Sequence, residues 1–378
     1  MSVTVSTNQR GVALITVLVV VALLTITVTE FTYSVQLDAF RAQNARHSLQ
    51  ASLLARSGIN LAEGFLMLDD DPKYDAFTEE WYQQMLEFCD GLPIGESMAI
   101  RCRPKDESGK VNINLTHPPG NRPVALRTDD SQQITADTVL RDAVRCFFMN
   151  LFSDADVQGT PINQALVDYW SQEPVELPDG QKRGPPDFNS LEDFGAQFGL
   201  TAQQIRSLRP FLTAQKRNVL PTINVNTAPA QVLSAVLNPE EEGCPSNEIV
   251  DQIMERRGID GEGFKNRGEL TSIISGAENA NAKKGLLGVT SNLWRLEASG
   301  VANYDPERPD SGIGQTLSVL VSRKPDNQHR NPETGQPGWT LRAVDWQKEG
   351  GARLFWEQPQ ESDEQDSEEP TEEDRLGD

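Results

Sequence analysis

The sequence predicts an α+β protein anchored in a membrane, and three observations carry this prediction. An uncharged, strongly apolar stretch of 18 residues lies close to the N-terminus. Strand-like alternation of apolar and polar residues occurs before residue 115 and again after residue 291. Between these two regions the pattern is helical, with loops rich in Pro and Gly. A helical block inserted into a single antiparallel sheet would explain strand-like segments on both sides of it.

The N-terminal region predicts one long helix. Residues 1–11 are a polar leader, and the uncharged run from Val12 to Thr29 is long enough to cross a hydrocarbon core of about 30 Å. Proline is absent between Gly11 and Pro72, so the helix is expected to cover residues 12–68, apolar in its first half and amphipathic in its second.

Charge and glycine add two expectations for this helix. Arg10 precedes the apolar run and Glu30 and Asp38 follow it, which favours a cytoplasmic leader and an exported remainder. Gly58 and Gly64 are weak points, each costing about 1 kcal/mol relative to Ala.

The exported part combines strands and helices. Residues 98–115 predict two short strands around a turn at 106–109, and three further strands are expected at 293–298, 316–321 and 340–346. Ser190 and Thr201 are expected to cap helices. The six predicted helices are Ala136–Phe152, Asn163–Trp170, Ser190–Phe198, Thr201–Leu208, Ala228–Leu237 and Ser246–Arg257.

The four cysteines indicate disulfides in an oxidising compartment. Their even number suits disulfide pairing, and they form neither a C-x-x-C pair nor a cluster with the three histidines. Three pairings are formally open. A bridge between Cys89 and Cys102 spans a short loop, which would leave Cys146 to pair with Cys244, and this is the preferred arrangement.

The leader resembles that of type IV pilins and pseudopilins, in which a short polar segment ends in Gly before an apolar helix. The resemblance implies that a prepilin peptidase cleaves between Gly11 and Val12 and that the new amine of Val12 is then methylated. An uncleaved signal anchor is the alternative. Most such proteins carry Glu at the fifth mature position, where this chain has Thr16, and the lack of that Glu resembles the K subunit of type II secretion pseudopili.

Two internal stretches extend the resemblance to K-type pseudopilins. Residues 106–115, DESGKVNINL, and residues 223–233, INVNTAPAQVL, are similar to hallmark stretches of that family. The resemblance implies a pilin-like antiparallel sheet with a large inserted helical domain of the SAM or helix-hairpin-helix type. The expected units are a leader (1–11), a transmembrane and amphipathic helix (12–68), the first part of the sheet (69–115), the helical domain with two small bundles (116–290), the remaining strands (291–356) and an acidic tail (357–378).

The stretch beginning at Ile223 also resembles the opening of helix-hairpin-helix DNA-binding domains. Those domains present backbone N–H groups to a phosphate at a G-x-G turn, whereas residues 238–245 here contain three consecutive glutamates. Glutamates would repel a phosphate, so no nucleic-acid partner is expected. The resemblance leaves a membrane-anchored DNA-uptake protein as the less favoured alternative. Four basic residues of this region form a patch that is interpreted as a solvated face: Arg256, Arg257, Lys265 and Arg267.

Net charge and the absence of known motifs argue against several other classes of function. The formal charge of −22 argues against a polyanionic partner. The last 22 residues contain eleven acidic residues and one basic residue, and we expect this tail to be disordered. G-x-S-x-G, H-E-x-x-H and P-loop motifs are absent, so no enzymatic activity is expected.

Calcium is the one metal that the resemblance raises, through oxygen ligands in the helical domain. The candidate ligands lie in and after the helix that ends at Trp170, in a loop less rich in Asp than that of the family: Asp168, Glu173, Glu176 and Asp179.

The resemblance as a whole implies a minor pseudopilin of the inner membrane with a periplasmic C-terminal domain. It would act at the tip of the pseudopilus and start assembly with the I and J minor pseudopilins, on the inner-membrane assembly platform, after processing by the prepilin peptidase. The alternative interpretation is a minor type IV pilin.

Overall fold

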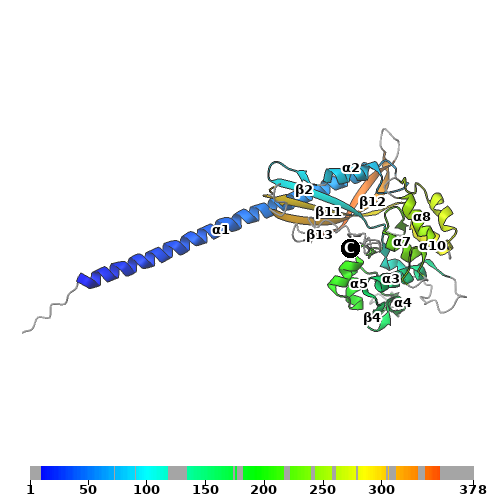
Figure 1. Ribbon diagram of the computed structural model, residues 1–378, viewed down its shortest axis with the longest axis horizontal. Coiled ribbons are helices and arrows are strands. Elements are labelled where there is room, and N and C mark those ends of the chain that lie inside the picture. The colour runs from blue at the N-terminus through cyan, green and yellow to red at the C-terminus, as the bar shows by residue number, and fades with distance from the viewer. Residues whose placement is uncertain are drawn as a thin grey trace, which may run out of the picture.

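The computed structural model describes the larger part of the chain and shows a long helix, a sheet and a helical domain (Figure 1). The described residues are 10–71, 73–89, 91–117, 134–172, 175–176, 182–216, 222–239, 243–257, 261–277, 280–303, 305, 312–330 and 337–349.

Helix α1 extends from Arg10 to Leu66 and has two halves with different surroundings. The first half projects from the rest of the molecule, and its apolar side chains are exposed. The second half lies against the sheet. Among the described residues, α1 is the one helix long and apolar enough to cross a membrane, by its length and composition. The single long helix predicted from the sequence is therefore confirmed.

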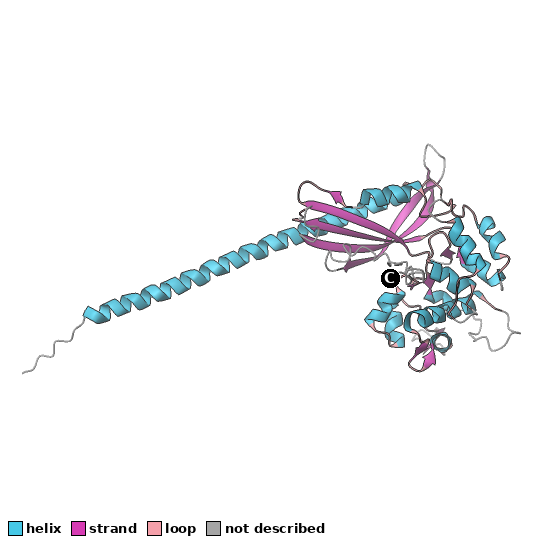
Figure 2. Ribbon diagram, in the orientation of Figure 1, coloured by secondary structure: helices cyan, strands magenta, loops and turns pink. Residues whose placement is uncertain are grey.

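The sheet has five strands in the order β1-β2-β11-β12-β13, and every neighbouring pair is antiparallel (Figure 2). Strands β2 and β11 are neighbours although the helical domain separates them in the sequence, and Asp106 pairs with Trp294 at their junction with that domain. The three strands expected after residue 291 are confirmed. The strand bounds are Leu92–Pro93 for β1, Met98–Asp106 for β2, Leu293–Ala302 for β11, Ile313–Arg330 for β12 and Pro337–Glu349 for β13.

The expectation of two strands of one sheet within residues 98–115 is wrong in part. After β2 the chain turns away, and β3 (Val111–Asn112) pairs in parallel with β8 (Leu212–Thr213) inside the helical domain. The residues after Asp106 therefore already belong to the helical domain.

Helix α1 and the sheet approach each other closely at two glycines. A Cβ at Gly300 would lie 2.5 Å from Leu54 Cβ and 2.6 Å from the backbone nitrogen of Ala55. A Cβ at Gly58 would lie 2.8 Å from the Cβ of Ala298. Gly58, which weakens the isolated helix, is therefore required for helix–sheet packing.

A further helix, α2 (Glu80–Cys89), was not predicted and covers the sheet next to α1. Its Trp81 contacts Trp294 of β11 edge to face, with ring centroids 5.3 Å apart. The disulfide between Cys89 and Cys102 joins the end of α2 to β2, with 4.8 Å between the two Cα atoms.

The helical domain lies beyond the sheet, at the end of the molecule farthest from the N-terminus of α1 (Figure 1). The six predicted helices are present with ends shifted by at most two residues, and two more follow them. The bounds are Ala136–Phe152 (α3), Ile162–Trp170 (α4), Leu191–Phe198 (α5), Ala202–Leu208 (α6), Ala230–Leu237 (α7), Glu248–Arg256 (α8), Arg267–Ile274 (α9) and Ala280–Leu286 (α10).

Short elements complete this domain. A 3-10 turn follows β3, and pairs of two-residue strands join the loops. Their bounds are Ile113–Thr116 for the 3-10 turn, Asp156–Val157 for β4, Thr160–Pro161 for β5, Val175–Glu176 for β6, Lys182–Arg183 for β7, Ile223–Asn224 for β9 and Leu287–Gly288 for β10.

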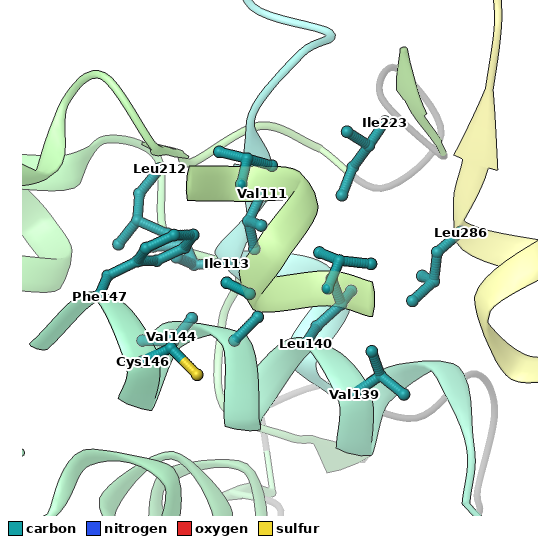
Figure 3. Close-up of a cluster of buried hydrophobic side chains, with 14 of the residues drawn as sticks. Val111, Ile113, Val139, Leu140, Val144, Cys146, Phe147, Leu212, Ile223 and Leu286 are labelled. Carbon is teal, nitrogen blue, oxygen red and sulfur yellow. The ribbon is translucent and has the colours of Figure 1, made fainter. Parts of the chain in front are cut away.

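The expected caps are present on α5 and α6. The Ser190 hydroxyl accepts a hydrogen bond from the backbone N–H of Asp193, and Thr201 and Gln204 form a capping box. Helices α3 and α7 pack at the centre of the domain core, which Val144, Phe147 and neighbouring side chains fill (Figure 3).

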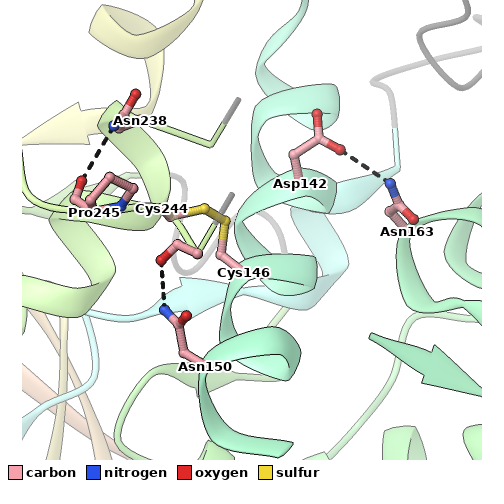
Figure 4. The surroundings of a disulfide bond; sticks show 8 residues. Asp142, Cys146, Asn150, Asn163, Asn238, Cys244 and Pro245 are labelled. Carbon is pink, nitrogen blue, oxygen red and sulfur yellow. Dashed lines mark hydrogen bonds between the residues drawn. A yellow bond between two sulfur atoms is a disulfide. The ribbon is translucent and has the colours of Figure 1, made fainter. Parts of the chain in front are cut away.

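A second disulfide closes the helical domain. Cys146 on α3 is bonded to Cys244, with 5.9 Å between their Cα atoms (Figure 4). The Asn150 side chain donates a hydrogen bond to the carbonyl oxygen of Gly243 beside this bridge, at 3.0 Å. The bridge closes a loop of 98 residues, for which the chain-entropy model gives a stabilisation of about 5 kcal/mol. Both disulfides are those preferred from the sequence.

The close approach at Gly300 gives a prediction. In the portion from Asp38 onward, Gly300→Ala should lower the free energy of unfolding by about 2 kcal/mol, because the added methyl overlaps the α1 backbone. The control is Gly64→Ala, at an exposed helical position with nothing within 4 Å of the new Cβ. That control should stabilise by up to about 1 kcal/mol. Urea unfolding measures both, and equal effects would contradict the packing described.

Candidate functional site

The residues of the expected leader cleavage lie at the start of α1. Gly11 and Val12 are in its first turn, where only the backbone is described, and Thr16 lies in the exposed half. The helix is continuous through these positions. Processing and methylation at this point stay predictions.

The calcium ligands expected from the resemblance fall mostly outside the described residues. Glu173 and Asp179 are among the residues not described, and of Glu176 only the backbone in β6 is described. Asp168 is exposed on α4 and accepts a hydrogen bond of 2.6 Å from Gln164. Within the described ranges, no group of three or more His, Cys, Asp or Glu side chains is arranged to hold a metal ion.

The two stretches that carry the family resemblance pack against each other where the sheet meets the helical domain. A Cβ at Gly109 would lie 2.9 Å from the backbone nitrogen and the Cα of Ala228. The backbone N–H of Asn224 donates to the carbonyl oxygen of Ser108 at 2.8 Å. We call this region, formed by residues 106–109, 223–228 and 291, the junction.

Asp106 is the centre of the junction. Its carboxylate is buried and accepts hydrogen bonds from the hydroxyls of Thr227 and Ser291 and, at 2.7 Å, from the backbone N–H of Ser108. Burial raises the pKa of Asp106 to about 6, although these hydrogen bonds act in the opposite direction. The Thr227 hydroxyl is directed to Asp106, and α7 begins directly after Pro229.

In the two stretches, asparagine side chains form hydrogen bonds with backbone groups of other loops. Asn226 donates to the carbonyl oxygen of Phe264 at 3.0 Å and accepts from its N–H at 2.9 Å. Asn114 makes the same two bonds with Phe188, at 2.9 and 2.8 Å. Asn224 donates to the carbonyl of Asp75 and to the Ser291 hydroxyl. Each side chain satisfies backbone groups of a loop far away in the sequence, which explains why Asn recurs in both stretches.

A buried ion cluster next to the junction was missed in the sequence. Arg323 on β12 is fully buried and pairs with Asp69, at 2.8 Å, and with Asp75, while its guanidinium lies 4.0 Å from the centroid of the Trp339 ring. The second oxygen of Asp75 accepts from the backbone N–H of Ser291 at 2.6 Å. The Asp75 carboxylate thus joins the loop after α1 to the sheet, through Arg323, and to the junction, through Ser291. No local pattern marks these residues, because they come from segments far apart.

The basic residues of the DNA-binding reading are engaged within the domain. Arg257 donates to the carbonyl oxygens of Val225 and Ala228, and Arg256 pairs with Glu269. The remaining two act similarly: Lys265 pairs with Glu262 and Arg267 donates to the carbonyl oxygen of Lys284. All four basic side chains thus bind carboxylates or carbonyl oxygens of the helical domain itself. The three glutamates at 240–242 lie outside the described residues.

The raised pKa of Asp106 predicts a pH effect. Because the folded-state pKa of about 6 exceeds the ordinary value of 3.8, Asp106 binds its proton more tightly in the folded state. Its contribution to stability is full below pH 4 and lost as the pH rises through 6, on the order of 3 kcal/mol in total.

Asp106→Asn removes this titration. Between pH 4 and 7 the stability of the unmodified protein should therefore fall relative to that of the variant, as measured by urea unfolding at a series of pH values. Parallel pH profiles of the two proteins would show that Asp106 titrates normally.

Three comparisons with known proteins point to one family. The family model described as type II secretion system protein K matches residues 223–290, a region that begins in the junction and includes helices α7 to α10. The type II secretion system protein K of Pseudomonas aeruginosa is 26% identical over 366 residues, covering 90% of this chain and 98% of that protein.

A solved structure shares the fold. The crystal structure of the GspK–GspI–GspJ complex from the type 2 secretion system of enterotoxigenic Escherichia coli contains a chain that matches with a TM-score of 0.55 and 14% identity. The match covers 82% of this chain and 99% of that one. With the long apolar helix, the sheet packed on it and the inserted helical domain, these matches lead to one conclusion: the chain belongs to the type II secretion system protein K family of minor pseudopilins, which are structural proteins of secretion.

Proposed function

We propose that this protein forms the tip of a type II secretion pseudopilus and starts its assembly together with the I and J minor pseudopilins. One observation carries the proposal: the helical domain lies at the end of the molecule opposite the apolar half of α1 (Figure 1). In a filament whose subunits align their apolar helices, this domain would occupy the space of the next subunit. A subunit built in this way can be added only at the end of the filament.

The surface of α1 supports a partner at its side. Leu49 and Leu53 are 62% and 58% exposed, one helical turn apart, in the half of α1 that lies on the sheet. The relative of known structure from E. coli was solved in complex with GspI and GspJ. We infer that the equivalent proteins of the same cell pack against this exposed face of α1.

The apolar half of α1 supports an inner-membrane location. We propose that it crosses the inner membrane with the leader in the cytoplasm and the folded part in the periplasm, where both disulfides can form. After the prepilin peptidase removes residues 1–11, the assembly platform would move this helix into the filament core. Thr16 in place of Glu fits a subunit with no other subunit above it, because such a subunit has no neighbouring terminal amine to pair with.

The test of the proposal is co-purification of the portion from Asp38 onward with the soluble I and J pseudopilins of the same cell. We expect a stable ternary complex. Leu49→Asp with Leu53→Asp should abolish the complex, because two charges would be buried in an apolar contact. The matched control is Leu151→Asp, at a residue 37% exposed on α3 of the helical domain, which should leave the complex intact. Absence of any complex with the unmodified protein would refute the proposal.

Leader processing gives a second prediction. Intact mass and N-terminal sequencing of the protein from membranes should show a chain that begins at methylated Val12. Gly11→Val should block cleavage, because a branched side chain would occupy the position next to the scissile bond, whereas Gln9→Val in the same leader should be processed normally. An unmodified N-terminus in the wild-type protein would identify an uncleaved signal anchor.

A further inference from the structure

A large groove separates the sheet from the helical domain. Its volume is about 2380 Å³, well above the 300–1,000 Å³ that is usual for small-molecule sites, so its size suits a peptide segment. The sheet contributes side chains from the face opposite α1, because Gly300 and Ala298 face α1 while Arg295 and Glu297 line the groove. The helical domain contributes the segments 184–192 and 206–216.

The groove differs in charge from the rest of the chain. Nine basic and seven acidic side chains line it, whereas the whole sequence has 34 basic and 56 acidic residues. Four of the nine bases already pair with Glu side chains of the groove: Lys105, Lys110, Arg209 and Arg295. The other five are exposed and make no ion pair with any residue that the structure describes: Arg103, Arg206, Lys216, Lys324 and Arg342.

Apolar side chains lie among these cations. Val344 is 49% exposed and Phe77 is 36% exposed, and both line the groove. An occupant that pairs with these five cations and covers the exposed apolar side chains therefore combines an apolar or aromatic part with several carboxylates. An open surface with unpaired cations and exposed apolar groups is typical of an interaction site.

We propose that the occupant is the C-terminal segment of this chain, residues 350–378. The segment begins with Gly350-Gly351, a dipeptide that favours chain reversal, and continues with Leu354-Phe355-Trp356. The eleven acidic residues from Glu357 onward follow directly. Apolar residues and carboxylates thus occur in the combination that the groove requires.

The position of the last described strand makes this docking sterically accessible. Strand β13 lines the groove from Thr340 to Asp345 and ends four residues later at Glu349, which is about 13 Å farther along the strand. The 29 residues that follow can span about 95 Å when extended, so a reversal after Glu349 returns the segment to the groove with length to spare.

In this arrangement the aromatic residues contact the sheet face and the carboxylates contact the free cations on both sides. Arg103, Lys324 and Arg342 belong to the sheet, while Arg206 and Lys216 belong to the helical domain. The docked segment would therefore connect the two parts of the molecule.

The test is digestion of the full chain, purified in detergent, with an endopeptidase that cleaves after Glu. A synthetic peptide of residues 350–378 in the same tube serves as the reference for protease activity. At about 0.1 M salt, where the Debye length is about 10 Å, the segment in the protein should be cleaved about tenfold more slowly than the peptide. At about 1 M salt, where the Debye length is about 3 Å, most of this protection should disappear.

Charge reversal provides the matched comparison. The double variant Arg206→Glu with Arg342→Glu should lose the protection at low salt, whereas Arg145→Glu, at an exposed position on α3 outside the groove, should retain it. Equal cleavage of the segment and the peptide at both salt concentrations would overturn the proposal without the use of any variant. Cleavage at equal rates together with saturable binding of the labelled peptide to a chain truncated after Glu349 would instead assign the groove to an acidic segment of another protein.

Discussion

The pairing of β2 with β11 is the constraint on which the rest of this structure depends. These strands are neighbours in the sheet, yet the whole helical domain lies between them in the sequence. Both ends of the domain must therefore leave the sheet at one point, where Asp106 pairs with Trp294. The hydrogen bonds of Asp106 with Thr227 and Ser291 join the middle and the end of the insertion to that point. Since this carboxylate is buried, its three donors hold the domain in one orientation on the sheet.

The position of the helical domain follows from this constraint, and so does the proposed role. A domain that leaves the sheet at its far end cannot lie beside the apolar half of α1 (Figure 1). The close approach of Gly58 and Gly300 fixes the sheet on the other half of α1 without room for adjustment. The apolar half of α1, the sheet and the helical domain are consequently in series along one axis, which suits the proposed position at the end of a filament.

Much of the fold could be predicted from the sequence, because its signals are local. The uncharged run, the alternation in β11, β12 and β13, and the caps at Ser190 and Thr201 each lie within a few residues. Helices α2, α9 and α10 were not predicted, although they are no shorter than α6, which was. The junction and the Arg323 cluster could not be predicted, since their partners are 121 to 254 residues apart. For Asp106 and Thr227 the family stretches indicated the right segments, but their contact depends on tertiary structure.

The insertion of the helical domain between β2 and β11 also determines the order in which the sheet can form. Strand β2 is synthesised long before β11, so one of its edges has no partner until about 190 further residues have been added. Contacts of such high sequence separation form slowly, and an unpaired strand edge is prone to wrong association in the meantime. The Cys89–Cys102 bridge, which closes only 13 residues, can form early and hold β2 beside α2. Completion of the sheet is therefore a late event, which the closure of the Cys89–Cys102 bridge can precede.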